Sequence, residues 1–312
     1  MSWKRINKIF EPTGEFSWSK SHAQVPVPIY LKELDVLRVF FSTRDLNSRT
    51  YTSFVDLSAK DPSKILYVHD KPVMELGEIG TFDDCGVMAS CVIKVKNELW
   101  MYYIGWNVRN TIPFHNSIGL AVSDDNGLSF KRKFVGPVID RNHIEPFFAG
   151  TIDVKKINNK WFCWYLSCTG WRELNGKMEP RYHLKMATSF DGINWLRKGT
   201  IALDYENDNE AGIANASVEK LEDGYKMYYC SRNFNYRIES RESYKIKCAK
   251  SDDGIIWNRI NEDGLLPEYN SNSWDSQMTA YPNIILVNNK KYMFYNGNEF
   301  GKNGFGYAIY EG

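Results

Sequence analysis

Short apolar and aromatic runs, separated by polar turns, make up the hydrophobic pattern of this chain. Apolar and polar residues alternate with a period of two in VMASCVIKV (87–95) and YKIKCAKSD (244–252), and no segment sustains a helical period of 3.6. Aromatic and β-branched residues in such runs favour half-buried strands. The pattern therefore predicts an all-β protein.

A long internal repeat organises these strands. Segments 36–44, 99–106, 161–168, 225–232 and 291–298 look alike, because each is a short aromatic strand that follows a polar turn. The last aromatic residue of each strand serves as an anchor: Phe41, Tyr103, Tyr165, Tyr229 and Tyr295. Successive anchors are 62, 62, 64 and 66 residues apart, and periods of this size account for the whole chain.

A second element recurs after the middle anchors. SDDNGLSF (123–130), SFDGINW (189–195) and SDDGIIW (251–257) share a serine, an aspartate two residues later, a glycine and an aromatic residue. Asp and Gly at these positions predict a tight turn between two strands, with the aromatic side chain returning to the core. The ligand series of an EF-hand is missing, so these turns are not expected to bind calcium.

Each period then contains four short antiparallel strands, as a propeller blade does. We predict one five-bladed β-propeller domain over residues 1–312, and expect the last strand, FGYAIYEG, to pair with the N-terminal region and close the ring. The predicted blades cover approximately 20–80, 81–142, 143–206, 207–270 and 271–312.

Composition narrows the function. Aromatic residues make up 15% of the chain. The net charge is +1, so the overall charge does not favour nucleic acid or an anionic membrane as a binding partner. No apolar run is long enough to span a bilayer, and because residues 1–16 contain no apolar core we expect no secretory signal there. The six cysteines form no disulfide or zinc pattern, so we expect reduced core thiols, a cytoplasmic protein, and neither a metal nor a cofactor.

A titratable residue lies 19 or 20 positions before every anchor. These residues are His22, Asp84 (next to Asp83), Glu145, Glu210 and Asp275. In a propeller the innermost strand of each blade lines the central channel, so one histidine and several carboxylates are expected to converge at its mouth. Two carboxylates flanking a glycosidic bond are the usual means of hydrolysing it. The alternative is that these acids are turn residues at the solvent edge of each strand.

Residues just past the anchors are candidate substrate contacts on the same rim. Arginine can fork onto hydroxyl or acidic groups, and tryptophan can stack on a sugar face. The set consists of Arg44, Trp106, Trp171, Arg232 and Asn298. The charged stretch RIESRESYKIK (237–247) is instead expected to be a solvated strand pair.

These features resemble the five-bladed glycosidase superfamily of arabinanases, xylosidases, invertase-like fructosidases and mannoside phosphorylases. The likeness covers nearly the whole chain and is greatest to the mannoside-phosphorylase type in the first two blades, over VPVPIYLKELDVLRVFFSTRD (25–45) and FDDCGVMASCVIKVKNELWMYYIGW (82–106). The family's Glu-Asp-Pro-Arg motif, whose Asp is catalytic, corresponds to Asp83-Asp84-Cys85-Gly86, so the resemblance implies a catalytic Asp84. Gly86 replaces the motif's arginine, which weighs against phosphate binding.

The resemblance to other family members implies a role for Glu145, but this chain differs from them at one position in the first blade. Their blade-three acid corresponds to Glu145, whereas their blade-one carboxylate is replaced here by His22. We predict a glycoside hydrolase-like enzyme with Asp84, Glu145 and Glu210 as its catalytic set. Glu145 would be the acid and Asp84 the base, while Glu210 and Asp275 would hold sugar hydroxyls.

The contacts predicted for His22, Asp83, Arg44 and Arg232 would hold the remainder of a carbohydrate substrate. Three alternatives stay open: a mannoside-type phosphorylase, a non-catalytic sugar-binding propeller, and a glycan-biosynthetic enzyme acting on an activated or lipid-linked sugar. The sequence does not determine the oligomeric state.

Overall fold

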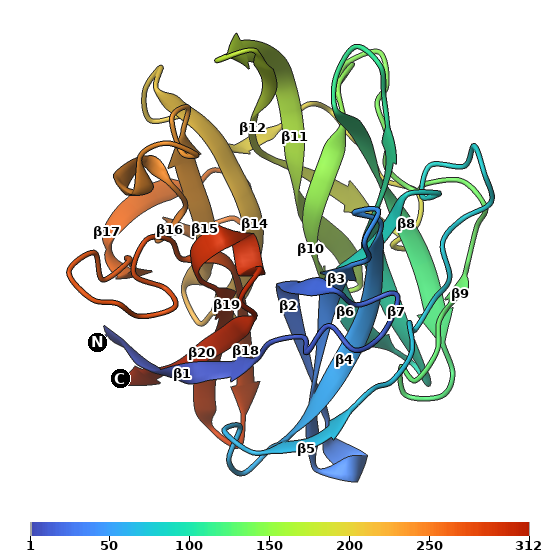
Figure 1. Cartoon of the computed structure of the whole chain (residues 1–312). Coiled ribbons are helices and arrows are strands. Elements are labelled where there is room, and N and C mark those ends of the chain that lie inside the picture. Colours follow the sequence, from blue (N-terminus) through green and yellow to red (C-terminus); the bar gives the residue numbers. More distant parts are fainter. Residues whose placement is uncertain (1, 312) are drawn as a thin grey trace.

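Antiparallel strands account for the regular structure of the chain (Figure 1). The computed structural model describes residues 2–311, apart from the side chains of residues 262 and 263. Within the described residues, helical structure is limited to short 3₁₀ turns: η1 (Lys32–Leu34), η2 (Ser240–Glu242) and η3 (Asn298–Gly301). The predicted all-β class is confirmed.

Hydrogen bonds join the strands into one four-stranded and two eight-stranded sheets. Each eight-stranded sheet consists of two groups of four antiparallel strands, joined by a single parallel pair, Thr50–Gly86 in one and Tyr182–Gly212 in the other. The first group contains β2 (Ser21–Leu31), β3 (Val36–Arg44), β4 (Thr50–Ser58) and β5 (Ile65–Val68). The second contains β6 (Gly86–Val95), β7 (Glu98–Val108), β8 (Phe114–Ser123) and β9 (Lys131–Arg132). The third contains β10 (Ala149–Ile157), β11 (Lys160–Leu174), β12 (Lys177–Ser189) and β13 (Ile201–Leu203).

The fourth group has the same plan, and the fifth combines both ends of the chain. The fourth contains β14 (Glu210–Leu221), β15 (Gly224–Asn233), β16 (Lys245–Ser251) and β17 (Asn258–Leu265). The fifth contains β18 (Ala280–Val287), β19 (Lys290–Asn296), β20 (Phe305–Glu311) and β1 (Ser2–Phe10). β1 pairs antiparallel with β20, which confirms the predicted pairing of the last strand with the N-terminal region.

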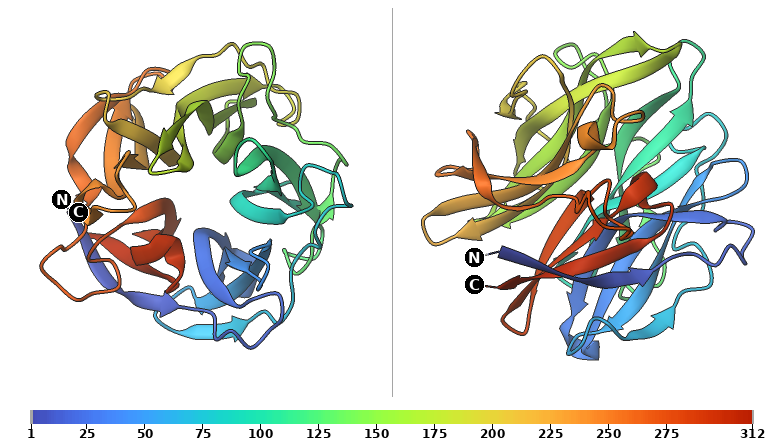
Figure 2. Two further views of the ribbon diagram at one scale, coloured as in Figure 1. Left: turned by 45° about the horizontal axis from the view of Figure 1, so that its top comes forward. Right: turned by 60° about the vertical axis from the view of Figure 1, so that its left-hand side comes forward.

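The core lies between neighbouring groups, which follow one another around a ring (Figure 2, left). The anchor aromatics fill these spaces: Tyr103 packs with Phe54 of the first group, and Phe41 packs with Phe294 of the fifth. The anchors are at most 2% exposed. Because one apolar cluster joins the first and fifth groups, burial of aromatic surface holds the ends of the chain together.

The serine–aspartate–glycine turns form as predicted and tie neighbouring groups together. At the turn after β12, the Ser189 hydroxyl accepts the Gly192 amide at 3.0 Å, and the glycine adopts a φ of +75°. A Cβ at Gly192 would lie 2.9 Å from the Tyr102 hydroxyl, which itself donates to the Gly192 carbonyl. A larger residue would therefore strain the turn and displace a side chain of the preceding group.

All six cysteines are free, and five of them are buried. This agrees with the prediction of reduced core thiols.

Candidate functional site

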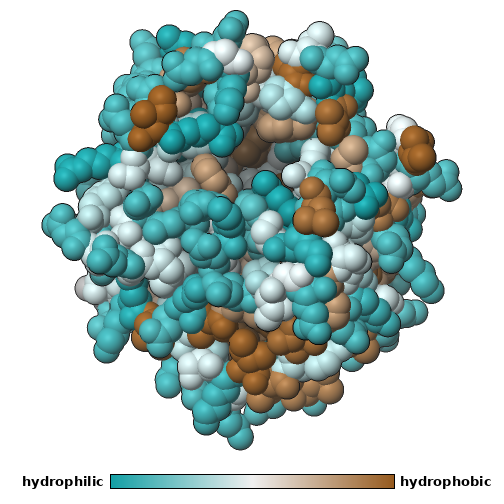
Figure 3. Space-filling view, in the orientation of Figure 1, coloured by the Kyte–Doolittle hydropathy of each residue, from teal (hydrophilic) through white to brown (hydrophobic). Residues whose placement is uncertain are grey.

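The innermost strands of the groups meet around a cavity of about 800 Å³. Every group contributes a residue from its first strand: His22 from β2, Met88 from β6, Gly150 from β10, Ala214 from β14 and Tyr281 from β18. Loops that follow the second strands build the rim, and Figure 3 shows a hollow on this face of the molecule. We call this space the axial cavity.

Aromatic rings form much of the wall of the axial cavity. They are Phe114, Phe148, Tyr182, Tyr236, Tyr244, Tyr281 and Phe300. A volume of this size, with apolar rings and a few convergent polar groups, is typical of a small-molecule site.

The charged groups of the wall are mostly basic. Five arginine and lysine side chains line the cavity, namely Arg44, Arg109, Lys177, Arg232 and Arg237. One carboxylate, Glu179, faces them from β12 among the described lining residues. The site is therefore cationic, although the whole chain carries a net charge of only +1.

Glu179 lies at the centre of a buried polar contact. Its carboxylate accepts the Tyr236 hydroxyl at 2.7 Å and the Arg237 Nε at 2.7 Å, and the residue is 6% exposed. Both partners come from the loop between β15 and β16. Burial, followed by the neighbouring Arg232 charge acting in the opposite direction, leaves the pKa of Tyr236 raised. Tyr236 therefore keeps its proton near pH 7 and donates it in the hydrogen bond to Glu179.

Arg232 is held beside this contact by tyrosines. Its Nε donates to the Tyr182 hydroxyl at 3.0 Å, its Nη2 donates to the Pro180 carbonyl at 3.0 Å, and its guanidinium lies 3.9 Å from the centre of the Tyr236 ring. Tyr182 also shares a short hydrogen bond with Tyr244. These contacts use some of the hydrogen-bond donors of the buried Arg232 guanidinium, and none of them is to a carboxylate.

Arg44 and His22 lie on the first group's side of the cavity. Burial, and then the charge of Arg44, lowers the pKa of His22 to about 4, so the imidazole is neutral near pH 7. His22 Nδ1 is hydrogen-bonded to the Ser21 hydroxyl at 2.7 Å. Burial also lowers the pKa of Arg44. His22, Arg44 and Arg232 all line the axial cavity, and their roles as substrate contacts stay predictions.

The in-register carboxylates, in contrast, lie inside the strand groups. Glu145 accepts the Tyr165 hydroxyl at 2.9 Å and Arg197 Nη2 at 2.6 Å. Its side chain is only 2% exposed and it does not line the axial cavity. Burial and the adjacent Glu145 charge raise the pKa of Tyr165. Glu145 therefore links Tyr165 on β11, the second strand of the third group, to Arg197 in the segment after β12.

The same arrangement of tyrosine, carboxylate and arginine occurs around the ring. Asp83 accepts Tyr103 and Arg132, each at 2.8 Å, in the second group. In the fifth group, Asp275 accepts Tyr295 at 2.7 Å and Arg5 at 2.8 Å. We call these contacts the internal ion pairs. They place Asp83 and Asp275 in the role of structural partners, away from the cavity-lining residues.

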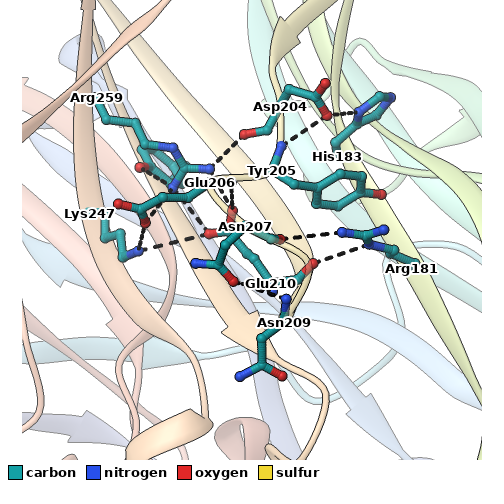
Figure 4. Close-up of polar contacts among 11 residues, drawn as sticks. Arg181, His183, Asp204, Tyr205, Glu206, Asn207, Asn209, Glu210, Lys247 and Arg259 are labelled. Atoms are coloured by element: carbon teal, nitrogen blue, oxygen red, sulfur yellow. Dashed lines mark hydrogen bonds and ion pairs between the residues drawn. The ribbon is translucent and has the colours of Figure 1, made fainter.

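Glu210 belongs to the internal ion pair of the fourth group (Figure 4). Arg259 Nη2 lies 2.6 Å from its Oε2, and Lys247 lies 3.8 Å from its Oε1. Arg259 also donates to the Tyr229 hydroxyl at 3.1 Å. Because Glu210 is 2% exposed and points to these partners, the structure does not bring it to Glu145 across the cavity.

Asp84 takes a different position from its neighbour Asp83. Its Oδ2 accepts the Gly80 amide at 2.9 Å, and its Oδ1 is buried without a hydrogen-bond partner among the described residues. It does not line the axial cavity. The expected convergence of Asp84, Glu145 and Glu210 at one cavity is thus not what the geometry gives, and their catalytic roles stay predictions.

Three residues predicted to contact the substrate lie outside the cavity lining and make packing or hydrogen-bond contacts with other residues. Trp171 packs against two cavity-lining rings, with centroid distances of 5.4 Å to Phe114 and 5.6 Å to Phe148. The Asn298 side chain accepts the backbone amide of Gln277 at 2.8 Å. Trp106 lies on β7 beside Gly86, outside the lining.

Sequence reasoning missed Glu179, Tyr236 and Arg237. Residues 237–247 are not the expected solvated strand pair, because only their last three residues enter β16, and Arg237 reaches the cavity from the preceding loop. The tyrosines at 236 and 244, which flank that charged stretch, were the available signal, since exposed turns rarely need two large aromatic residues.

No family model matches the chain. Two proteins of Mycobacterium tuberculosis, uncharacterized protein MT1551 of strain CDC 1551 / Oshkosh and uncharacterized protein Rv1502 of strain H37Rv, are each 32% identical to it over 311 aligned residues, which cover 100% of this chain and 100% of theirs. The chain belongs to the family of these mycobacterial proteins.

Solved structures share the fold at lower identity. A glycosyl hydrolase from Bacteroides ovatus aligns with a TM-score of 0.76 at 15% identity, covering 99% of this chain and 94% of the other. A thermostable family-43 glycoside hydrolase aligns at 0.67, with 14% identity and coverage of 95% and 90%. The β-1,2-mannobiose phosphorylase of Listeria innocua aligns at 0.69, with 11% identity and coverage of 99% and 96%. The resemblance to the propeller glycosidase superfamily is confirmed at the level of fold.

A search for membrane-crossing helices among the described residues finds none that is long and apolar enough. In the same part of the chain, no three histidine, cysteine, aspartate or glutamate side chains are grouped so that they could hold a metal ion.

Proposed function

We propose that the protein is a glycoside-cleaving enzyme, built as one five-bladed propeller domain over residues 1–312, that binds its sugar in the axial cavity. The five strand groups would be the blades. The observation that carries this proposal is the meeting of all the innermost strands around an aromatic cavity in which Glu179 is the one buried carboxylate among the described lining residues. The likeness to glycoside hydrolases and phosphorylases supports it through fold alone.

Glu179 and Tyr236 would carry the proton transfer. The hydroxyl of Tyr236 donates to Glu179 at 2.7 Å, so Glu179 would take the Tyr236 proton as that oxygen bonds to the anomeric carbon and the glycosidic bond breaks. The leaving oxygen would take a proton from solvent, and water would then release the sugar and return the proton to Tyr236. In sialidases a tyrosine takes the place of one of the two catalytic carboxylates, so a tyrosine–glutamate pair can replace the usual pair of carboxylates. Arg237 would hold the Glu179 carboxylate in place through its Nε. The aromatic wall would stack against the sugar.

Phosphorolysis is a second candidate, because the basic lining can hold an inorganic phosphate beside the scissile bond. The absence of the family motif's arginine at Gly86 weighs against the phosphate site of that type. Hydrolysis and phosphorolysis differ in their product, since phosphorolysis alone yields a sugar phosphate.

The test is a turnover screen on aryl glycosides and oligosaccharides, neutral and acidic, with and without phosphate. We expect cleavage by the wild type, and a loss of about 100-fold or more in kcat for Glu179→Gln. Glu173→Gln, an exposed change on the same β11–β12 hairpin, is the matched control and should keep full activity. Binding of sugars without turnover by the wild type would contradict the proposal and favour a sugar-binding propeller.

A further inference from the structure

Positive charge in the axial cavity exceeds what the neighbouring carboxylates can neutralise. Glu179, the acidic lining residue, is already engaged by Arg237. Arg44 and Arg232 remain inside the cavity, while Arg109 and Lys177 are exposed at its rim. The net charge of the whole chain is +1, so this concentration of cations is local.

Arg44 differs from the exposed rim cations Arg109 and Lys177 because it is partly withdrawn from solvent. Within the described residues its guanidinium has no salt bridge and no hydrogen bond, although it is half-buried. Its nearest electrostatic neighbours include Tyr281 and the like-charged Arg237. Desolvating an arginine without an acidic partner is costly, and an anionic ligand would relieve that cost.

Arg232 adds a second cation without a carboxylate. It is 3% exposed, and its guanidinium donates to the Tyr182 hydroxyl and to the carbonyls of Pro180 and Asn233. These contacts use three of the five N–H donors of a guanidinium, so two remain for a ligand. A planar guanidinium recognises carboxylate and phosphate oxygens better than neutral hydroxyls.

We propose that the axial cavity selects an acidic sugar, one that itself carries a carboxylate or phosphate group, and binds that group between Arg44 and Arg232 with the sugar ring against the aromatic wall. The proposal rests on the proposed function for its sugar component. A volume of about 800 Å³ leaves room for a sugar ring in addition to the anion. Arg109 and Lys177 at the rim would raise the rate at which anionic substrates enter.

The test is equilibrium binding by calorimetry with the full-length protein. The probes are D-glucuronate, N-acetylneuraminate and glucose 6-phosphate, with D-glucose as the neutral comparison and inorganic phosphate as the free anion. We expect at least one acidic sugar to bind about tenfold or more tightly than D-glucose and than inorganic phosphate. Whether a carboxylate or a phosphate sugar binds identifies the source of the anion.

Variants locate the anion. Arg44→Gln should lower the affinity for the acidic sugar by about tenfold or more and leave any affinity for D-glucose unchanged. Arg44→Lys should lose part of the affinity, because the charge remains while the fork is lost. Arg49→Gln, an exposed change at the arginine paired with Asp45 outside the cavity, should have no effect.

Equal affinity for acidic and neutral sugars, no effect of Arg44→Gln, or inorganic phosphate binding as tightly as every acidic sugar would each overturn the proposal. Thermal unfolding of Arg44→Gln at the wild-type temperature shows that a loss is local. Cleavage of neutral glycosides without preference for acidic sugars would refute this inference alone. Tight binding of an acidic sugar with no turnover would refute the proposed cleavage alone.

Discussion

The internal ion pair of the third group allows a quantitative test of its structural role. Arg197→Met leaves the Glu145 carboxylate, which is 2% exposed, with the Tyr165 hydroxyl and a lysine at 3.9 Å. Breaking a buried pair in this way costs about 3 kcal/mol of unfolding free energy. Glu145→Leu leaves Arg197, which retains the Asp140 carbonyl, and costs about 2 kcal/mol.

The double variant should be much more stable than the sum of the two changes. Glu145→Leu with Arg197→Met removes both charges and fills similar volume, so we expect a loss of about 1 kcal/mol or less. The resulting coupling between the two sites is about 4 kcal/mol. Urea unfolding followed by tryptophan fluorescence measures all three values, with Lys94→Met at an exposed salt bridge as the control.

Additive effects within about 0.5 kcal/mol would refute the reasoning, because independent sites behave in that way. The double variant also separates structure from catalysis. If Glu145 is structural, the refolded double variant keeps its turnover. A stable double variant with no turnover would return Glu145 to the catalytic set.

Three further outcomes follow from named contacts. The imidazole of His22 should titrate in NMR near pH 4, and Arg44→Gln should raise that pKa because a like charge is removed; a midpoint at the ordinary value of 6.5 in both proteins would contradict this. Since the native pKa is lowered, the neutral imidazole's contribution to stability is complete above about pH 6.5 and is lost as pH falls toward 4, a loss that should disappear in His22→Gln urea-unfolding curves. Trp171→Ala should destabilise the protein by about 2 kcal/mol and weaken sugar binding, because two rings of the cavity wall lose their backing; unchanged calorimetric affinity would count against that support. Arg5→Met leaves Asp275 buried without its arginine and should cost about 3 kcal/mol in urea unfolding, whereas a neutral effect would show that the N-terminal strand contributes little.

The ring and its strand order were predictable because they depend on a regular period. The anchors Phe41 to Tyr295 recur at intervals of 62 to 66 residues, and each must be buried against a neighbouring group. The same period marked Glu145, Glu210 and Asp275 as equivalent positions, whereas in the second group Asp83, and not the predicted Asp84, makes the equivalent contact. Repetition in the sequence thus identified which residues occupy equivalent places in the groups.

The partners of those carboxylates were not predictable from the same pattern. Arg132 and Arg259 lie 49 residues after their carboxylates, Arg197 lies 52 residues after, and Arg5 reaches Asp275 from the other end of the chain. Only the folded ring brings these residues together. When the arginine partners are not known, a buried structural acid and a catalytic acid look the same in the sequence.

The cavity wall escaped prediction for a different reason. Glu179, Tyr236 and Arg237 come from hairpin and loop segments whose lengths differ from group to group. Segments of different length cannot be aligned from one repeat to the next, so the repeat does not predict where their side chains lie. His22, Arg44 and Arg232, which line the cavity, lie on the repeated strands, so the period placed them.

The most direct test of the account is a comparison of kcat for Glu179→Gln and Asp84→Asn on a substrate that the wild type cleaves. We predict that Glu179→Gln loses about 100-fold or more in kcat, while Asp84→Asn, whose side chain lies outside the cavity lining, keeps a rate within a few-fold of the wild type. Full activity in Glu179→Gln together with loss in Asp84→Asn would contradict the assignment of the active site to the axial cavity.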